Sequence, residues 1–184
     1  MQQNHSIIQY IRTVTKLVIF VFVTTVYSQQ DPEYTQYMYN TMSINPGYAG
    51  SKGYMSLTGL SRTQWVGIDG APETQTLSLH SPIGLSGLGL GLNIIKDALG
   101  PSEEIYFDAN IAYAIRTSET GNLAFGLRLG GRLLNIDWSK GTFQNPDVVF
   151  NQNIDNRFMP TIGGGLYYHT EKWYIGLSVP NFLR

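Results

Sequence analysis

The sequence predicts an all-β protein, an antiparallel outer-membrane β-barrel, on three observations. Apolar and polar residues alternate along most of the chain, as in strands that contact lipid on one face and water on the other. Only 14% of the 184 residues are charged, against about 25% in typical soluble proteins. The chain also holds 20 glycines and 12 tyrosines. The net charge of -1 argues against nucleic-acid binding, and the lack of cysteine excludes a disulfide scaffold.

Residues 1–28 have the pattern of a secretory signal peptide. Arg12 and Lys16 provide positive charge, a largely apolar stretch of ten residues follows from Leu17 to Val26, and compact residues precede Gln29. A membrane anchor helix is the alternative. Ten helical residues span only about 15 Å, half of a hydrocarbon core of roughly 30 Å. We therefore expect export and cleavage before Gln29.

Period-2 alternation predicts about seven strands in the rest of the chain. The clearest two run from Glu103 to Thr117 and from Leu123 to Leu133. The side chains expected to face lipid are Ile105, Phe107, Ile111, Ile115, Leu123, Phe125, Leu127 and Leu129. Arg128 and Arg132 fall on the opposite face, among glycine and alanine, and are expected to face the lumen. A soluble β-sandwich also alternates, but long strands, low charge and the two arginines favour the barrel.

The predicted strands imply a division of the chain into three parts. Residues 1–28 are the signal peptide, residues 29–52 a periplasmic or lumen segment, and residues 53–184 the N-terminal half of a transmembrane β-barrel. Seven strands do not close a single-chain bacterial barrel, because such barrels have an even strand number. The expected fold is therefore an incomplete barrel, part of a larger one.

The connections between the predicted strands differ in length and suggest an orientation. Short turns face the periplasm in outer-membrane barrels and longer loops face outside. By this rule Val66–Glu73, Asp97–Ser102 and Ile136–Arg157 face outside. The last is the longest and is the candidate partner-contact loop, with Trp138, Phe143, Val148, Val149 and Phe150 as its large apolar residues. Folding back onto the barrel as a lid or partial plug is the alternative role for these residues.

No group of residues has the spacing of a catalytic, cofactor-binding or metal site. His80 and Ser81 are neighbours in a predicted strand, so their side chains point to opposite faces and cannot form a nucleophile–base pair. His169 lacks a companion at metal-ligand spacing, and Asp69 and Glu73 are best explained as loop charges in water. We expect no enzyme activity, no cofactor and no metal.

Several motifs are similar to those of one known family. They are the stretch from Gln30 to Asn40 (QDPEYTQYMYN), Asn45 to Ser51 (NPGYAGS), Arg62 to Gly67 (RTQWVG), Gly70 to Thr76 (GAPETQT), Pro160 to Tyr168 and Tyr174 to Pro180. Together they resemble the PorP/SprF family, outer-membrane barrels of the type IX secretion system in Bacteroidetes. The resemblance covers residues 29–184, in family order. Members of the family are longer, which implies that this chain is the N-terminal part of a complete barrel.

The resemblance implies a role in protein secretion. Family members act beside the secretion translocon and are often paired with a large secreted protein, such as a gliding-motility adhesin, whose C-terminal domain they help to export or attach to the surface. The implied partners are a cargo with a type IX C-terminal signal, other secretion components and outer-membrane lipid. Two other classes stay open, a general porin-like channel and an outer-membrane enzyme such as a lipid hydrolase.

Overall fold

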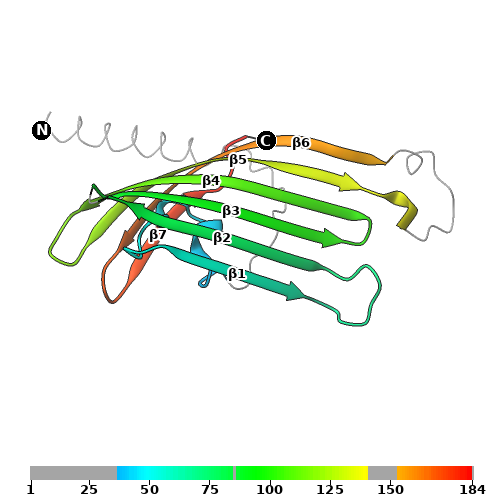
Figure 1. Cartoon of the computed structure of the whole chain (residues 1–184), viewed down its shortest axis with the longest axis horizontal. Helices are drawn as coiled ribbons and strands as arrows, with labels where there is room; N and C mark the ends of the chain where they lie inside the picture. The colour runs from blue at the N-terminus through cyan, green and yellow to red at the C-terminus, as the bar shows by residue number, and fades with distance from the viewer. Residues whose placement is uncertain (1–36, 85, 141–152, 184) are drawn as a thin grey trace, which may run out of the picture. The chain divides into compact units, whose positions relative to one another are not determined.

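The computed structural model of the chain describes residues 37–84, 86–140 and 153–183. They form one antiparallel sheet of seven strands that lie side by side in chain order (Figure 1). The strands are β1 (Ser56–Thr63), β2 (Glu73–Ile83), β3 (Leu88–Leu99), β4 (Ser102–Arg116), β5 (Asn122–Ile136), β6 (Ile154–His169) and β7 (Tyr174–Val179). The predicted all-β fold and strand number are confirmed. No helix in the described part of the chain is long and apolar enough to cross a membrane.

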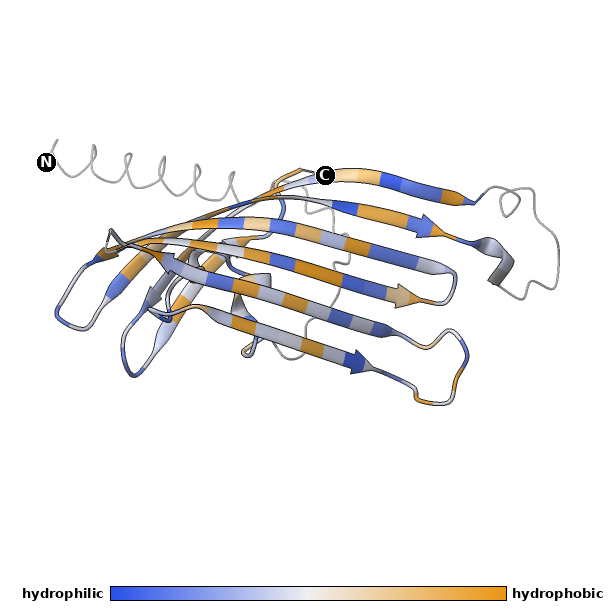
Figure 2. Cartoon of the chain, in the orientation of Figure 1, coloured by the Kyte–Doolittle hydropathy of each residue, from blue (hydrophilic) through white to orange (hydrophobic). Residues whose placement is uncertain are grey.

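Most of the strands are long and alternate between exposed and buried residues, which explains why period-2 alternation in the sequence predicts them. β4 and β5 have 15 residues each and β6 has 16, more than the 9–11 that a tilted strand needs to cross a bilayer. Figure 2 shows apolar and polar residues alternating along β3 and β4. Large apolar side chains such as Leu92, Ile111 and Leu127 are exposed on one face, whereas Asn93, Asn110 and Arg128 are buried on the other.

The sheet curls, and its concave face is covered by the chain's own N-terminal part, drawn in blue in Figure 1. We call residues 40–50 the inner segment. It contains two short 3-10 turns, η1 (Thr41–Ser43) and η2 (Pro46–Tyr48). Its Asn-Pro-Gly sequence favours the second turn, because proline presets the first position and the Asn45 side chain accepts a hydrogen bond from the Gly47 N–H (2.9 Å).

The connections differ from those predicted in one informative respect. The first and fifth span residues 64–72 and 137–153 and are the two longest. The third was predicted to run from Asp97 to Ser102, and this is wrong: only Gly100 and Pro101 lie between β3 and β4. Lys96 and Asp97 interrupt the apolar pattern of that hairpin, but Asp97 still pairs with Glu104 in the ladder, because strand pairing requires backbone groups and not apolar side chains.

β6 begins at Ile154, inside the predicted long loop that reached Arg157. A register shift near Leu134 and Ile136 and a positive φ of 49° at Asn156 mark a bulge, which breaks the period-2 pattern there. Pro160 lies farther along β6, where β6 pairs with β5 on one side only. The pairing with β7 on the other side covers only residues 164–169 of β6. Sheets tolerate proline at such edges.

Candidate functional site

The most elaborate polar site lies between the inner segment and the concave face, and Arg128 is at its centre. The Arg128 side chain is only 6% exposed. One of its terminal nitrogens donates to the carbonyl oxygens of Met42 (2.7 Å) and Ser43 (2.8 Å), and its Nε donates to Asn110 Oδ1 (3.2 Å). The carbonyls at the end of a short helical turn lack partners within the turn. Arg128 therefore supplies hydrogen bonds to two carbonyl groups at the end of η1.

Further polar residues of β2, β3, β4 and β6 surround this contact. Asp108 lies 3.9 Å from the Arg128 guanidinium as an ion pair and accepts a hydrogen bond from the Thr161 hydroxyl (3.3 Å). Buried hydrogen bonds also join the inner segment to β2 and β3: Asn40 donates to the Ser78 hydroxyl (2.7 Å), and Ser43 donates to Asn93 Oδ1 (3.4 Å). Ser78 donates to the same Asn93 oxygen. Buried polar groups cost free energy unless they are paired, so this network fixes the inner segment in one position.

Glycines on the concave face let the inner segment approach the sheet at backbone distance. A Cβ atom on Gly126 would overlap the backbone nitrogen of Gly47, and one on Gly89 would overlap the carbonyl oxygen of Ala49. On Gly165 a Cβ would overlap the Asn45 side chain. These three glycines lie in one row across the sheet, on β3, β5 and β6, and Ala112 of β4 stands between Gly89 and Gly126 in that row. The missing side chains thus form a track shaped for this segment.

Aromatic residues pack at the end of the inner segment. The Tyr48 ring makes edge contacts with His80 (5.3 Å between centroids) and Tyr167 (5.3 Å). The His80 ring also accepts a hydrogen bond at Nδ1 from the Gly50 N–H (3.2 Å). Burial raises the pKa of the Tyr48 hydroxyl, which therefore stays neutral at physiological pH. His80 is thus a packing and hydrogen-bonding residue of the concave face.

Arg132 lies on the same face as Arg128, four residues farther along β5, in a more open environment. Its side chain is 24% exposed, pairs with Glu104 at 3.5 Å and lies 5.9 Å from the centre of the Tyr106 ring. Tyr106 in turn donates a hydrogen bond to Glu104. The two predicted lumen arginines therefore have different surroundings: Arg128 is enclosed by the inner segment, and Arg132 belongs to a half-buried polar cluster nearer the long connections.

The sequence model of one family matches this chain, that of the type IX secretion system membrane protein PorP/SprF, over residues 26–184. The match covers the whole sheet and the inner segment. The chain belongs to the PorP/SprF family. It is therefore a membrane component of the type IX secretion system. Neither a curated protein nor a solved structure matches the chain.

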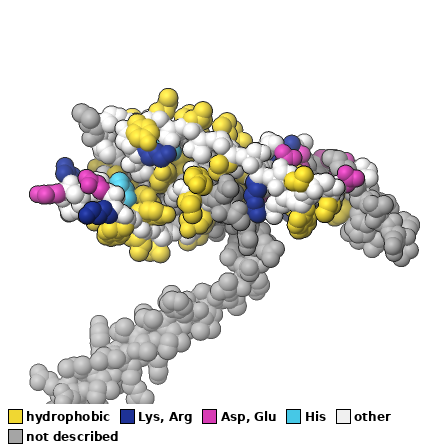
Figure 3. All heavy atoms as spheres, turned by 90° about the horizontal axis from the view of Figure 1, so that it is seen from below, with side chains coloured by type: hydrophobic (Ala, Val, Ile, Leu, Met, Phe, Trp, Pro, Cys, Tyr) yellow, Lys and Arg dark blue, Asp and Glu magenta, His cyan; other side chains and the backbone are white. Residues whose placement is uncertain are grey.

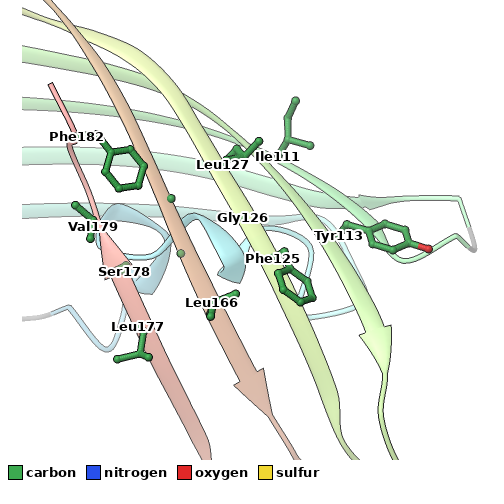
Figure 4. Close-up of a pocket in the computed structure, with 12 residues that line it drawn as sticks. Ile111, Tyr113, Phe125, Gly126, Leu127, Leu166, Leu177, Ser178, Val179 and Phe182 are labelled. Carbon is green, nitrogen blue, oxygen red and sulfur yellow. The ribbon is translucent and has the colours of Figure 1, made fainter. Parts of the chain in front are cut away.

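The convex face of this PorP/SprF protein carries the apolar residues expected to contact lipid. Phe107, Ile111, Ile115, Phe125, Leu127 and Leu129 are exposed there, and Ile105 and Leu123 are half-buried. Figure 3, seen from below the view of Figure 1 and so toward the β1 edge, shows hydrophobic side chains along the middle of the visible side and acidic ones near its two ends. Between β5, β6 and β7 the face is hollowed into an apolar groove of about 770 Å³, where Leu127, Leu166 and Leu177 line neighbouring strands (Figure 4).

The predicted partner-contact loop is placed only in part. Trp138 begins η3 (Trp138–Lys140), is half-buried, and donates its backbone N–H to Asn153 Oδ1 (3.1 Å). The other four residues of that prediction, Phe143, Val148, Val149 and Phe150, lie outside the described residues. The predicted signal peptide, residues 1–28, also lies outside the described residues.

The described residues of this PorP/SprF protein also include no group of three His, Cys, Asp or Glu side chains that could hold a metal ion. His80 lies on the concave face, and Ser81 follows it with the opposite orientation along β2. What the concave site does chemically is to hold a chain segment: the Arg128 guanidinium donates to two of its backbone carbonyls, and the Leu166 carbonyl accepts a hydrogen bond from the Asn45 side chain (2.8 Å). The sequence prediction missed this, although glycines spaced two apart on one face of successive strands were a signal that another backbone approaches there.

Proposed function

We propose that this PorP/SprF chain acts in the outer membrane as a scaffold that assists export or surface attachment of a large secreted partner of the adhesin or gliding-motility type. The observation that carries the proposal is the inner segment on the concave face, held by buried Arg128 and by the glycine track. A general porin needs that face for a water-filled path. Here the corresponding part of the face is occupied by protein, which favours a scaffold over an open solute channel.

The height of the apolar band supports a membrane-spanning role. On the convex side of β4, outward residues stay apolar from Ile105 to Ile115, whereas Glu103 precedes them. Ten steps along a strand measure about 34 Å, or about 26 Å along the membrane normal at a tilt of about 40°. Outer-membrane barrels have an apolar band of about 25 Å. With the predicted signal peptide, this supports insertion in the outer membrane after cleavage.

The orientation follows from the same rule that was applied to the sequence. The two longest connections, residues 64–72 and 137–153, leave the sheet at the same end because the strands are antiparallel and in order. We assign this end to the cell surface and the N-terminal segment of residues 29–52 to the lumen or the periplasm. The long connection, with Trp138, Phe143, Val148, Val149 and Phe150, remains a candidate contact for cargo or for other secretion components.

The test combines secretion with conductance. Deleting the gene should leave the type IX cargo inside the cell or shed from its surface, and the purified chain in planar bilayers should show no stepwise ion conductance. A strain that still displays its cargo normally after the deletion would remove the export role. Regular conductance steps from the purified chain would favour the porin.

A further inference from the structure

The apolar groove on the convex face is centred on a missing side chain. Gly164 on β6 is paired with Leu127 on one side and with Val179 on the other, and directly paired residues lie on the same face. Because both neighbours carry exposed apolar side chains, the glycine leaves a gap in the outward row. Phe182 borders this gap: its N–H donates to the Ile162 carbonyl (2.6 Å), and its ring lies 3.3 Å from the position of a Cβ on Gly164.

The groove has the size of a ligand site and the chemistry of a hydrocarbon site. Its volume of about 770 Å³ falls within the range of about 300–1,000 Å³ that is typical of ligand pockets. None of the twelve lining residues is charged, and the larger side chains are aliphatic or aromatic. A charged or strongly polar ligand would lose its hydration there without gaining a charged partner, so the lining favours a hydrocarbon ligand.

The groove lies at the depth of the acyl chains of one leaflet. At the end of the strands that carries the short turns, such as residues 117–121 and 170–173, Tyr168 packs against Trp173 (5.2 Å between ring centroids). Such aromatic residues mark the interface between membrane and water. Leu177 in the groove is four residues from Trp173, about 13 Å along the strand, or about 10 Å of depth at a tilt of about 40°. The hydrocarbon of one leaflet is about 15 Å deep.

The width of the groove admits a single chain and excludes a helix. Leu127 on β5 and Val179 on β7 stand on either side of β6 (Figure 4). Two strand spacings separate their backbones by about 10 Å, and the side chains narrow this gap further. An α-helix with its side chains is about 10–12 Å across and does not enter. A single unbranched hydrocarbon chain does.

We propose that the apolar groove binds one acyl chain of a phospholipid, from the leaflet at the short-turn end of the strands, with the chain lying over Gly164. The groove opens on the outward apolar band, so lipid hydrocarbon reaches it without crossing water. The rest of the band touches lipid from one side, whereas the groove has a floor and two walls. A chain held there contacts β5 and β7 across β6 and so holds the short strand β7 to the sheet. This inference rests on the membrane insertion in the proposed function, and it does not depend on the export role.

Photo-crosslinking from the lipid tests the proposal on the full chain. The vesicles contain phosphatidylethanolamine and phosphatidylglycerol, with a small share of phosphatidylethanolamine that carries a diazirine in the middle of one acyl chain. Leu166 in the groove and Leu90 on β3 are the matched pair, because their exposed fractions are 41% and 40% and Leu90 pairs with Ile111 inside the apolar band. We expect mass spectrometry to find about tenfold or more adducts at Leu166 than at Leu90. Equal yields would show ordinary bilayer contact and would overturn the proposal.

Filling the groove should remove the preference for Leu166. Gly164→Leu supplies the missing side chain and should lower the adduct yield at Leu166 to that at Leu90. Gly59→Leu is the control, because Gly59 is also exposed and a Cβ there meets only the Leu77 side chain at 3.9 Å. It should leave the yield at Leu166 unchanged. A yield that stays high in Gly164→Leu would refute the site. If this variant does not insert, the comparison of the two leucines in the unmodified chain decides.

A second probe asks whether protein covers the groove in cells. Leu177→p-benzoyl-phenylalanine should form an adduct with phospholipid, and an adduct with a second copy of the chain, the cargo or another secretion protein would contradict the proposal. Gene deletion tests the export role separately: normal cargo display after deletion removes that role and leaves the lipid site standing. Equal yields at Leu166 and Leu90 remove the lipid site and leave the export role. The absence of any lipid adduct on the chain would remove both the lipid site and the membrane insertion.

Discussion

Replacing Arg128 by leucine should destabilise this protein strongly and release the inner segment. The Arg128 side chain is buried, donates to two backbone carbonyls and one amide oxygen, and pairs with Asp108. Leucine removes all of these contacts and leaves a buried carboxylate without its positive partner. Breaking a buried ion pair from one side costs about 3–5 kcal/mol. We expect the free energy of unfolding to fall by that amount.

Two measurements on the refolded protein check this expectation. Reversible urea unfolding in lipid vesicles gives the change in free energy. Trypsin cleavage after Lys52, an exposed residue that follows the inner segment, reports whether the segment has left the concave face. Cleavage should accelerate about tenfold or more in the variant, because local release exposes the chain. The double variant Arg128→Leu, Asp108→Leu should recover most of the lost stability, since no unpaired charge remains.

Arg132→Leu is the matched control on the same strand and face. Its pair with Glu104 is 3.5 Å long and the side chain is 24% exposed, so solvent screens the interaction. We expect a loss below about 1 kcal/mol and unchanged cleavage after Lys52. Equal losses for Arg128→Leu and Arg132→Leu, or a double variant that is no more stable than Arg128→Leu, would refute the argument that Arg128 holds the segment.

Two further pairs of variants test the glycine track and the two faces of the sheet by the same urea titration. Gly126→Ala should cost about 1–3 kcal/mol because its Cβ would overlap Gly47, whereas Gly59→Ala, which meets only the Leu77 side chain at 3.9 Å, should stay within about 0.5 kcal/mol. Leu92→Arg places a charge in the middle of the outward apolar run of β3 and should cost about 2–4 kcal/mol in vesicles, whereas Leu60→Arg on β1 faces inward and should cost less than about 1 kcal/mol. Indistinguishable losses within either pair would contradict the packing or the assignment of faces.

The sequence predicted the strands best where each residue had one clear environment. Along β4, Ile111 is exposed while Asn110 and Ala112 are buried, so hydropathy and orientation agree. The prediction was poorer at the strand ends, because Asp97 and Glu104 extend the β3–β4 hairpin with polar residues that alternation cannot reveal. It was also poorer at the start of β6, where the bulge at Asn156 disrupts the period.

The inner segment could not be derived from periodicity. Its two turns have three residues each, too few to show a helical pattern. Its hydrogen bonds to the sheet use backbone atoms of Met42, Ser43 and Gly50 as much as its side chains, and backbone atoms have the same chemistry in every residue. The recognisable signs lay elsewhere in the chain, in glycines of the concave face such as Gly89 and Gly126. The composition shows only that the chain is rich in glycine. The pairing of the strands is needed to see that several of these glycines face the same inner segment.

Arg128 illustrates why an arginine among small residues has two explanations that the sequence cannot separate. A water-filled lumen and a packed polypeptide segment both suit glycine neighbours and a positive charge. The structure favours the second explanation at Arg128, because a planar guanidinium can donate to the adjacent carbonyls of Met42 and Ser43 at once. The same face near Arg132 stays half-exposed. The concave face thus has a closed region around Arg128, which holds the chain's own segment, and a half-exposed polar region around Arg132, nearer the long connections. A scaffold that binds a partner at that end requires both, because the closed region gives rigidity and the half-exposed region gives access.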